Sequence, residues 1–448
     1  MSAHHTPMLR ALAASIRAGV PALLWGNPGT GKPHVSQPWL MVGSGTPRSS
    51  SAPSASRPTS SASASKSTAA PAKVGHVAYA PPGWARAASK ADRALVFFDE
   101  LTTAPPSVRK AMLRVLQERV VGDLQLPDTV AIVAAANPPE SAVDGYDLEP
   151  PMANRLLHLE FTFPLDSWLD GFVSGFDNII QPSMTDLIGR GDDQHRASTR
   201  AAVAAFHKSR PDLIEPGVPD DPTKAGRAWP SRRSWDNAAR VLCELRPGDD
   251  DGTVLVLKGT VGDGPANEFL AFQRDLDLPD PLDVIAHPTR YDWSGMRPDK
   301  AFATVNAVRA YVLGTTPDKT LWLGAVNALS TVAEAGLLDI AQGAVAALLT
   351  NMPDGVGVPR RVRRVRRAVC RHRPLGRMTE PRNGTASAHP PPFAAESDAV
   401  AQSLATPQMG RLRSGADFVL CRGADPPSTT DDSDTLICTP RQGSGGDA

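Results

Sequence analysis

Continuous apolar runs of strand length occur at three places in the first third of this 448-residue chain, at residues 20–25, 94–98 and 129–136. Runs without polar alternation are typical of strands that are buried on both faces of a parallel sheet. Each run is followed by glycine or a polar side chain, at the strand end where open α/β sheets bind ligands. The pattern therefore predicts an α/β fold with a candidate site at one edge of a parallel sheet.

Helical periodicity begins after the second run and prevails in the later part of the chain. Thr103 is the expected cap of a first amphipathic helix, and Pro105 and Pro106 suit its opening turn. Its apolar face is predicted to consist of Val108, Ala111, Met112, Val115 and Leu116. Further helices are predicted from the apolar stretches at residues 302–313, 321–338 and 339–351.

These patterns divide the chain into three parts. We expect an α/β core over residues 1–165, an α-helical lid and C-terminal helical region over residues 166–350, and a disordered tail rich in Arg, Pro and Ser over residues 351–448. Residues 33–74 of the core are also predicted to be disordered. Of the 27 residues from 46 to 72, 24 are Ser, Thr, Ala or Pro, which leaves too little apolar surface to offset the entropy of ordering.

The composition narrows the functional classes. Lys plus Arg and Asp plus Glu both number 47, so the chain has no overall charge that would indicate nucleic-acid or membrane binding. The four cysteines lie far apart without a CxxC pair, which favours neither a disulfide framework nor a zinc site. No apolar run approaches the roughly 20 residues of a membrane span. We therefore expect a reduced, cytoplasmic setting and no membrane contact.

A glycine-rich loop follows the first predicted strand. Residues 26–32 match seven of the eight positions of the phosphate-binding (Walker A) pattern G-x-x-x-x-G-K-[ST]. Glycine lets backbone N–H groups close around an anion, and Lys32 would reach the β- and γ-phosphates. The alternative is a Gly/Pro turn with a solvated lysine. We favour phosphate binding by Gly26, Asn27, Pro28, Gly29, Thr30, Gly31 and Lys32.

The eighth position of the loop departs from this pattern. Pro33 stands where Ser or Thr normally supplies a hydroxyl to Mg²⁺, and proline also lacks a backbone N–H. We therefore expect weakened nucleotide binding and severely reduced hydrolysis. No helical pattern follows Pro33, and ordered sequence resumes near His76. The interruption is either a natural insertion or a shifted reading frame, and we favour the shifted frame; the same alternatives apply to residues 360–448.

Polar residues follow the other two predicted strands. Asp99 and Glu100 come directly after an apolar run, which places them beside the phosphate loop in an open α/β sheet. Asp99 would hold Mg²⁺, and Glu100 would act as the general base that polarises the attacking water. Asn137 follows the third run and would orient that water, although an isolated Asn–Pro is more often a turn.

The loop, the acidic strand end and the strand-end asparagine, in this order and spacing, resemble the AAA+ ATPases. Residues 23–32, 98–101 (Phe-Asp-Glu-Leu) and 136–138 (Ala-Asn-Pro) look like the MoxR branch of that family. The resemblance implies a ring-forming, chaperone-like oligomer that binds ATP and Mg²⁺ and couples ATP hydrolysis to remodelling of a partner protein. In that family the partner commonly carries a von Willebrand factor type A domain.

The resemblance also implies roles for two arginines and for Asn137. Asn137 matches the residue called sensor 1. Arg155, within Asn-Arg-Leu, occupies the place of the arginine finger that stabilises charge at a neighbouring subunit's γ-phosphate. Arg233 matches sensor 2 at the start of a lid helix, with Arg232 as the second choice.

Two other functions remain open. Because Pro33 removes a metal ligand, the chain could be a catalytically inactive nucleotide-binding or scaffold subunit, or a pseudogene product. Nine arginines between residues 360 and 377 could contact phosphate backbones, but aromatic residues for base stacking are missing from this run, so nucleic-acid binding is not expected.

Replacing Pro33 by Thr restores the missing hydroxyl but not the missing helix and strand of residues 34–72. Pro33→Thr alone is therefore expected to leave ATP turnover far below the level typical of the resembled family, as measured by phosphate release. Near-normal turnover from this one change would contradict the shifted-frame interpretation, whereas a Ser or Thr codon in an alternative frame of the DNA would support it.

Overall fold

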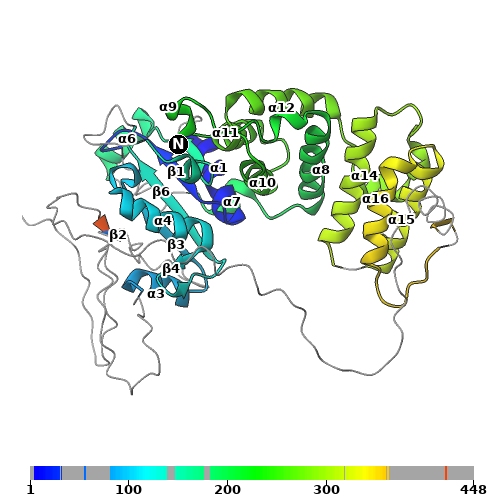
Figure 1. Ribbon diagram of the computed structural model, residues 1–448, viewed down its shortest axis with the longest axis horizontal. Helices are drawn as coiled ribbons and strands as arrows, with labels where there is room; N and C mark the ends of the chain where they lie inside the picture. The colour runs from blue at the N-terminus through cyan, green and yellow to red at the C-terminus, as the bar shows by residue number, and fades with distance from the viewer. Residues whose placement is uncertain are drawn as a thin grey trace, which may run out of the picture.

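The computed structural model describes residues 5–30, 32, 55–56, 81–138, 147–175, 182–316, 318–359, 361–362 and 419–420. Four strands form a parallel sheet in the order β3-β6-β1-β7 (Figure 1). These strands are β1 (Ala22–Trp25), β3 (Ala94–Phe98), β6 (Val130–Ala136) and β7 (Leu157–Glu160). The predicted α/β class, with a parallel sheet and a following helical region, is confirmed.

The register of the sheet aligns the carboxyl ends of three adjacent strands. Trp25 pairs with Ala136 between β1 and β6, and Phe98 pairs with Ala134 between β3 and β6. Every residue of β6 is buried, as its uninterrupted apolar sequence requires. The residues that follow β3, β6 and β1 therefore meet at one edge of the sheet. Within the described sheet, β3 is an outer strand with β6 as its single neighbour.

Each face of the sheet is covered by helices. On one face, α3 (Gly83–Lys90) and α4 (Pro106–Glu118) pack on Val96, Phe98 and Ile132. On the other face, α1 (His5–Ala18) and α11 (Asp250–Val261) pack on side chains that include Leu24, Phe97 and Val133. Successive strand residues face opposite sides, so both faces of each strand must be apolar.

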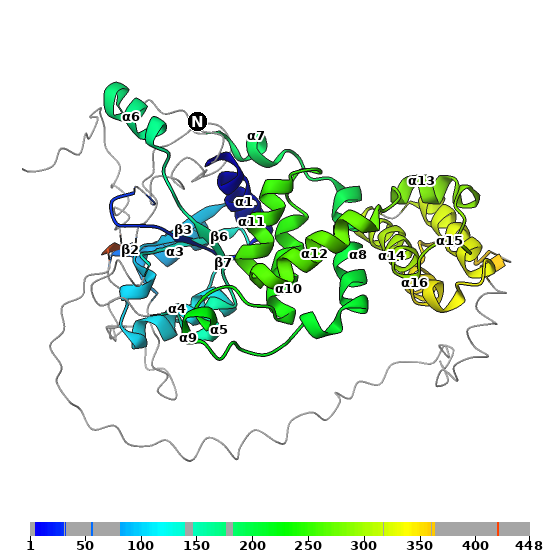
Figure 2. The ribbon, with the colours of Figure 1, turned by 90° about the horizontal axis from the view of Figure 1, so that it is seen from above.

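Helices form most of the remaining regular structure of the described chain. The core cluster on the α1 face continues from the sheet into α8 (Asp193–Ser209), α10 (Arg232–Leu242) and α12 (Asp263–Leu276). A separate apolar cluster joins α13 (Pro281–Ala286), α14 (Pro298–Gly314), α15 (Lys319–Glu334) and α16 (Leu338–Thr350), and α14 also packs against α8 (Figure 2). The sheet and the first group of helices therefore share one core. Domain limits at residues 165 and 350 stay a prediction.

The described residues also include several short helices, 3-10 turns and two-residue strands. They are α5 (Pro150–Ala153), α6 (Leu165–Ser174), α7 (Met184–Ile188), α9 (Pro222–Ala225), the 3-10 turns η2 (Leu101–Thr103), η5 (Pro211–Leu213) and η6 (Pro288–Arg290), and the strands β2 (Ala55–Ser56), β4 (Val120–Val121), β5 (Leu124–Gln125) and β8 (Val419–Leu420). β4 pairs with β5, and β2 pairs with β8, both antiparallel. In the described ranges, no helix combines the length and apolar character that crossing a bilayer requires.

The predicted cap of α4 is wrong. Thr103 belongs to the 3-10 turn η2, where its hydroxyl donates to the carbonyl of Glu100. α4 begins three residues later at Pro106 and has no side-chain cap. Proline has no backbone N–H, so the first turn of α4 has one fewer N–H group that needs an acceptor outside the helix. Most of the predicted disordered segments, residues 33–74 and 351–448, lie outside the described residues.

Gly259 provides a test of the contact between α11 and β7. A Cβ atom at Gly259 would overlap the carbonyl oxygen of His158 and the side chain of Leu157. Gly259→Ala is therefore expected to lower the free energy of unfolding by about 1–3 kcal/mol. Gly343 in α16 has open space around its would-be Cβ, so Gly343→Ala should instead raise it by about 0.5–1 kcal/mol. Denaturant unfolding of both variants measures the difference, and equal effects would refute the close packing.

Candidate functional site

The glycine-rich loop begins where β1 ends. The N–H of Gly26 donates to the carbonyl of Ala136 at 3.2 Å, which continues the pairing of β1 with β6. A Cβ at Gly26 would lie 2.7 Å from the carbonyl oxygen of Phe161, so this position accepts only glycine without movement. Gly29 has a φ of +79°, a value that side chains disfavour. Gly31 and Pro33 lie outside the described residues.

Lys32 lies at the centre of this sheet edge. Its side chain is buried, and its Nζ donates to the carbonyls of Gly26 and Asn27 and, at 2.8 Å, to Oδ1 of Asn137. These three acceptors match the three protons of the ammonium group. Burial lowers the pKa of Lys32, and the nearby charges of Asp99 and Glu100 oppose that shift. Contact with a phosphate would therefore require Lys32 to exchange at least one of these partners.

Asp99 and Glu100 follow β3 beside Lys32. Burial raises the pKa of Asp99, while a hydrogen bond from the N–H of Glu100 at 3.1 Å and the charge of Lys32 act in the opposite direction. Glu100 is exposed and has a φ of +54°. A residue with a side chain rarely adopts this conformation, and such strain concentrates at functional sites. The turn directs the chain from the strand into η2 and leaves the Glu100 carboxylate accessible to solvent.

The structure brings Arg155 and Arg233 together as a second group. Arg155 follows α5 and donates to Oε1 of Gln117 at 2.6 Å. Burial lowers the pKa of Arg155, and the charge of Arg233 adds to that effect. Arg233 is exposed in the first turn of α10, and it has no ion pair with any described residue. Arg232 pairs with Glu215 at 3.0 Å, so Arg233 is the more available of the two.

The two groups are not joined into one site within the chain. Lys32, Asp99, Glu100 and Asn137 influence one another at the sheet edge. In the described part of the molecule, neither Arg155 nor Arg233 shares a hydrogen bond or an ion pair with that group.

A buried histidine that the sequence did not single out joins the end of β1 to α5. The indole Nε1 of Trp25, the last residue of β1, lies 3.0 Å from Nδ1 of His158 in β7, and Nε2 of His158 lies 2.9 Å from the carbonyl of Ala153 in α5. An indole N–H only donates, so Nδ1 accepts and Nε2 carries the proton. His158 is therefore neutral, and burial lowers its pKa to about 4.

Further contacts extend this network to the start of α10. The guanidinium of Arg227 lies 3.8 Å from the ring centre of Trp25. Asn154, buried beside Arg155, donates to the carbonyl of Trp229 at 2.9 Å and accepts from the hydroxyl of Ser231 at 2.6 Å. The end of β1, the arginine after α5 and the arginine at α10 are thus held on one buried scaffold. A single polar residue, His158, among the leucines of residues 156–159 was the only signal of it in the sequence.

The residues present fit a nucleotide better than they fit its metal ion. In the described ranges, no cluster of three or more His, Cys, Asp or Glu could hold a metal. A magnesium ion would therefore rely on Asp99 and on the phosphates it accompanies. The glycines, Lys32 and the open space around Gly29 suit a phosphate chain. Pro33 cannot supply the hydroxyl that usually completes such a metal site.

Comparisons with known proteins add little to this geometry. No family model and no curated protein matches the chain. Among solved structures, the chain is similar to a crystal structure of a Cytophaga hutchinsonii protein described as a candidate ATPase. That match has a TM-score of 0.32 and 14% identity, and it covers 60% of this chain and 88% of the other.

His158 makes the stability of the fold depend on pH. Its pKa is about 4 in the folded chain, against 6.5 for an unperturbed histidine, so the unfolded chain binds more protons between these values. The free energy of unfolding should therefore fall by about 3 kcal/mol as the pH drops from 6.5 to 4. In His158→Asn, which does not titrate, this part of the loss should be absent. Identical pH profiles of the two proteins in urea unfolding would exclude a neutral buried His158.

Proposed function

We propose that this chain is an AAA+-type ATP-binding protein of the MoxR-like kind, whose activity is ATP hydrolysis coupled to remodelling of a partner protein. The observation that supports this most directly is the convergence of Lys32, Asp99 and Asn137 at one sheet edge, beside the loop at residues 26–30. These residue types at this place in a parallel sheet are those that phosphoryl transfer to water requires.

Each residue of the sheet edge has a distinct role in this proposal. The loop amides and Lys32 bind the phosphates, and Asp99 holds Mg²⁺, which neutralises charge on the phosphate oxygens. Glu100 takes the proton of the attacking water as general base, since its carboxylate is exposed at the site. Asn137 orients that water and fixes Lys32 through its 2.8 Å hydrogen bond.

The separate arginine pair favours a homo-oligomeric ring. Arg155 and Arg233 carry like charges side by side and share no contact with Asp99 or Lys32 among the described residues. An anion from outside the chain would balance the positive charge of these two neighbouring guanidinium groups. A neighbouring subunit's nucleotide would supply that anion. The remodelled partner, including one with a von Willebrand factor type A domain, is part of the same proposal and follows from the resemblance.

Pro33 favours a second candidate function, a nucleotide-binding or scaffold subunit without turnover. Loss of the hydroxyl weakens metal binding more than phosphate binding, because the loop glycines and Lys32 are still present. Such a subunit would bind ATP, and it would assemble with other subunits without releasing phosphate.

Three single variants distinguish these functions by measuring ATP binding with calorimetry and turnover by phosphate release. Glu100→Gln should retain binding and reduce turnover by roughly 10²-fold or more, because it removes the general base. Lys32→Ala should abolish binding. Glu118→Gln is the matched control, since Glu118 pairs with Arg114 on the surface of α4, and it should leave both properties unchanged.

The outcomes separate the proposals clearly. Binding without turnover in the parent chain would support the inactive subunit. Absence of ATP binding by correctly folded protein, with or without Mg²⁺, would refute both proposals.

A further inference from the structure

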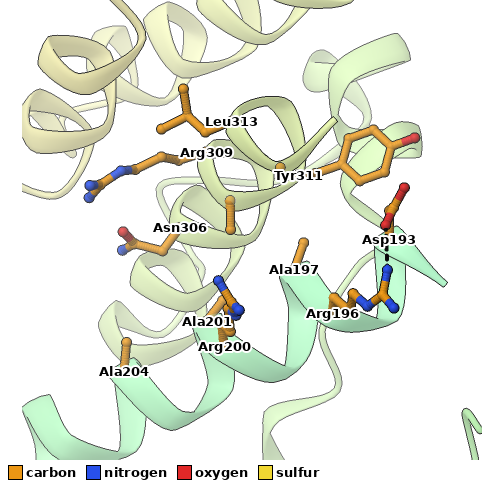
Figure 3. A pocket seen from close by; sticks show the side chains of 12 residues that line it. Asp193, Arg196, Ala197, Arg200, Ala201, Ala204, Asn306, Arg309, Tyr311 and Leu313 are labelled. Atoms are coloured by element: carbon orange, nitrogen blue, oxygen red, sulfur yellow. Dashed lines mark hydrogen bonds and ion pairs between the residues drawn. The ribbon is translucent and has the colours of Figure 1, made fainter. Parts of the chain in front are cut away.

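A cavity of about 470 Å³ lies between α8 and α14, and the nucleotide-type site does not use it (Figure 3). Alanine side chains of both helices line it, namely Ala197, Ala201, Ala204 and Ala310. Because alanine is small, the helices leave open space above these positions. Figures 1 and 2 place α14 on the far side of α8 from the sheet, so this cavity is remote from the phosphate loop.

The polar lining of the cavity is strongly basic. Arg196 and Arg200, one turn apart on α8, and Arg309 on α14 contribute three guanidinium groups, and Asp193 contributes the one carboxylate of the lining. Asn306 lies on the same helix as Arg309 and adds an amide. Figure 3 shows these side chains reaching from the two helices that form the walls.

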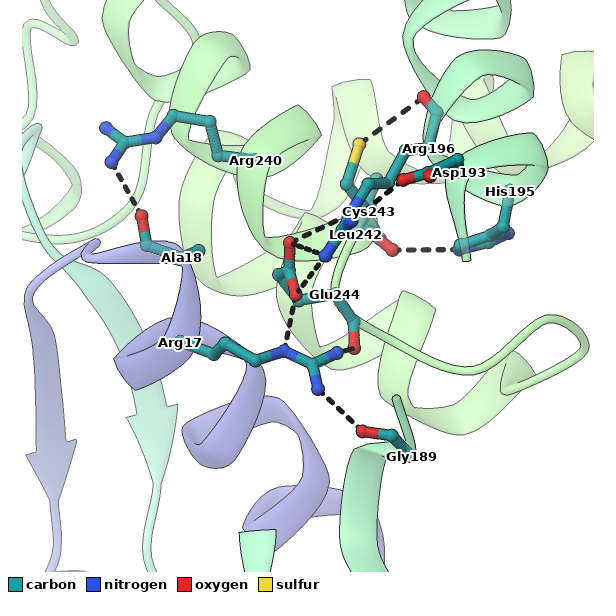
Figure 4. Close-up of polar contacts among 10 residues, drawn as sticks. All are labelled: Arg17, Ala18, Gly189, Asp193, His195, Arg196, Arg240, Leu242, Cys243 and Glu244. Carbon is teal, nitrogen blue, oxygen red and sulfur yellow. Dashed lines mark hydrogen bonds and ion pairs between the residues drawn. The ribbon is translucent and has the colours of Figure 1, made fainter. Parts of the chain in front are cut away.

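Arg196 already has its partners. It donates to both carboxylate oxygens of Glu244, at 3.0 and 3.2 Å, and to Asp193 at 3.0 Å (Figure 4). Arg17 of α1 pairs with the same Glu244 and also donates to the carbonyl of Gly189 at 2.7 Å. Arg196 is thus part of a junction that fixes α1, α8 and the end of α10, and its charge is already balanced by Glu244 and Asp193.

Arg200 and Arg309 differ from Arg196 because neither forms an ion pair with a carboxylate in the part of the chain that the structure describes. Arg200 approaches the thiol of buried Cys243; burial raises the pKa of that thiol and Arg200 opposes the shift. Two guanidinium groups without a counterion among the described residues, next to a third that is neutralised, leave the cavity with an excess of positive charge. A dianion would balance it.

We propose that this cavity is a binding site for a small organic phosphate, a phosphomonoester of about mononucleotide size. A phosphate dianion accepts hydrogen bonds from guanidinium groups on both walls, and guanidinium forks suit phosphate oxygens. The volume falls within the usual range for small-molecule sites. The alanines and the ring of Tyr311 supply apolar surface for the remainder of the ligand. This proposal does not depend on ATP hydrolysis.

The test uses calorimetry on the full chain carrying Lys32→Ala, so that the phosphate loop lacks its lysine. AMP is the phosphomonoester probe, inorganic phosphate tests the phosphate alone, and succinate tests a dicarboxylate. AMP should bind this protein, and adding Arg200→Ala together with Arg309→Ala should raise its Kd at least tenfold. Arg274→Ala removes an arginine from α12, outside the cavity, and should change the Kd less than twofold.

Each other outcome overturns part or all of the proposal. Failure of AMP to bind at millimolar concentration, or equal affinity after removal of both arginines, would exclude a phosphate site here. Succinate binding as tightly as AMP would replace the phosphate assignment with a general dianion site. If inorganic phosphate bound as tightly as AMP, the alanines and Tyr311 would not contribute apolar contacts to the organic part of the ligand. Because the probe protein lacks Lys32, failure of ATP binding at the loop leaves these results unaffected.

Discussion

The parallel pairing of β6 with both β3 and β1 is the constraint on which the candidate site depends. β6 is buried along its whole length, so its position between the other two strands is fixed by apolar contacts on both faces. The register then determines that the residues after Phe98, Ala136 and Trp25 emerge at one edge. Lys32 reaches Asn137 because the ends of β1 and β6 are level. Since the Lys32 side chain is buried, losing any of its three hydrogen bonds would leave a polar group unsatisfied.

A second constraint links this edge to the surface that carries Arg155 and Arg233. The neutral His158 joins Trp25 to the carbonyl before Asn154, and Asn154 in turn holds the start of α10 through Trp229 and Ser231. Each of these buried polar groups has its hydrogen-bond partner in this arrangement. A buried polar group without a partner would lower the free energy of unfolding. The positions of the two arginines are therefore tied to the end of β1 by hydrogen bonds rather than by loop contacts.

The sequence predicted the elements with strong local patterns and missed those that depend on distant partners. The apolar runs at 94–98 and 129–136 predicted the bounds of two strands to within a residue. An uninterrupted apolar run of this length is stable when it is buried on both faces, as in a parallel sheet covered by helices. Thr103 was misplaced as a cap because its hydroxyl finds Glu100 within a 3-10 turn, which spacing does not reveal. The contacts of His158 depend on Trp25, a residue far away in the sequence. The sequence favoured Arg233 over Arg232, but it did not reveal the ion pair of Arg232 with Glu215.

The outer position of β3 has a consequence for the behaviour of the whole molecule. Its sequence, Ala-Leu-Val-Phe-Phe, is that of an interior strand, yet in the described sheet it has a neighbour on one side only. An apolar strand edge without a pairing strand is a template for pairing with other chains. A segment or a bound protein that covers this edge would therefore protect the chain from aggregation.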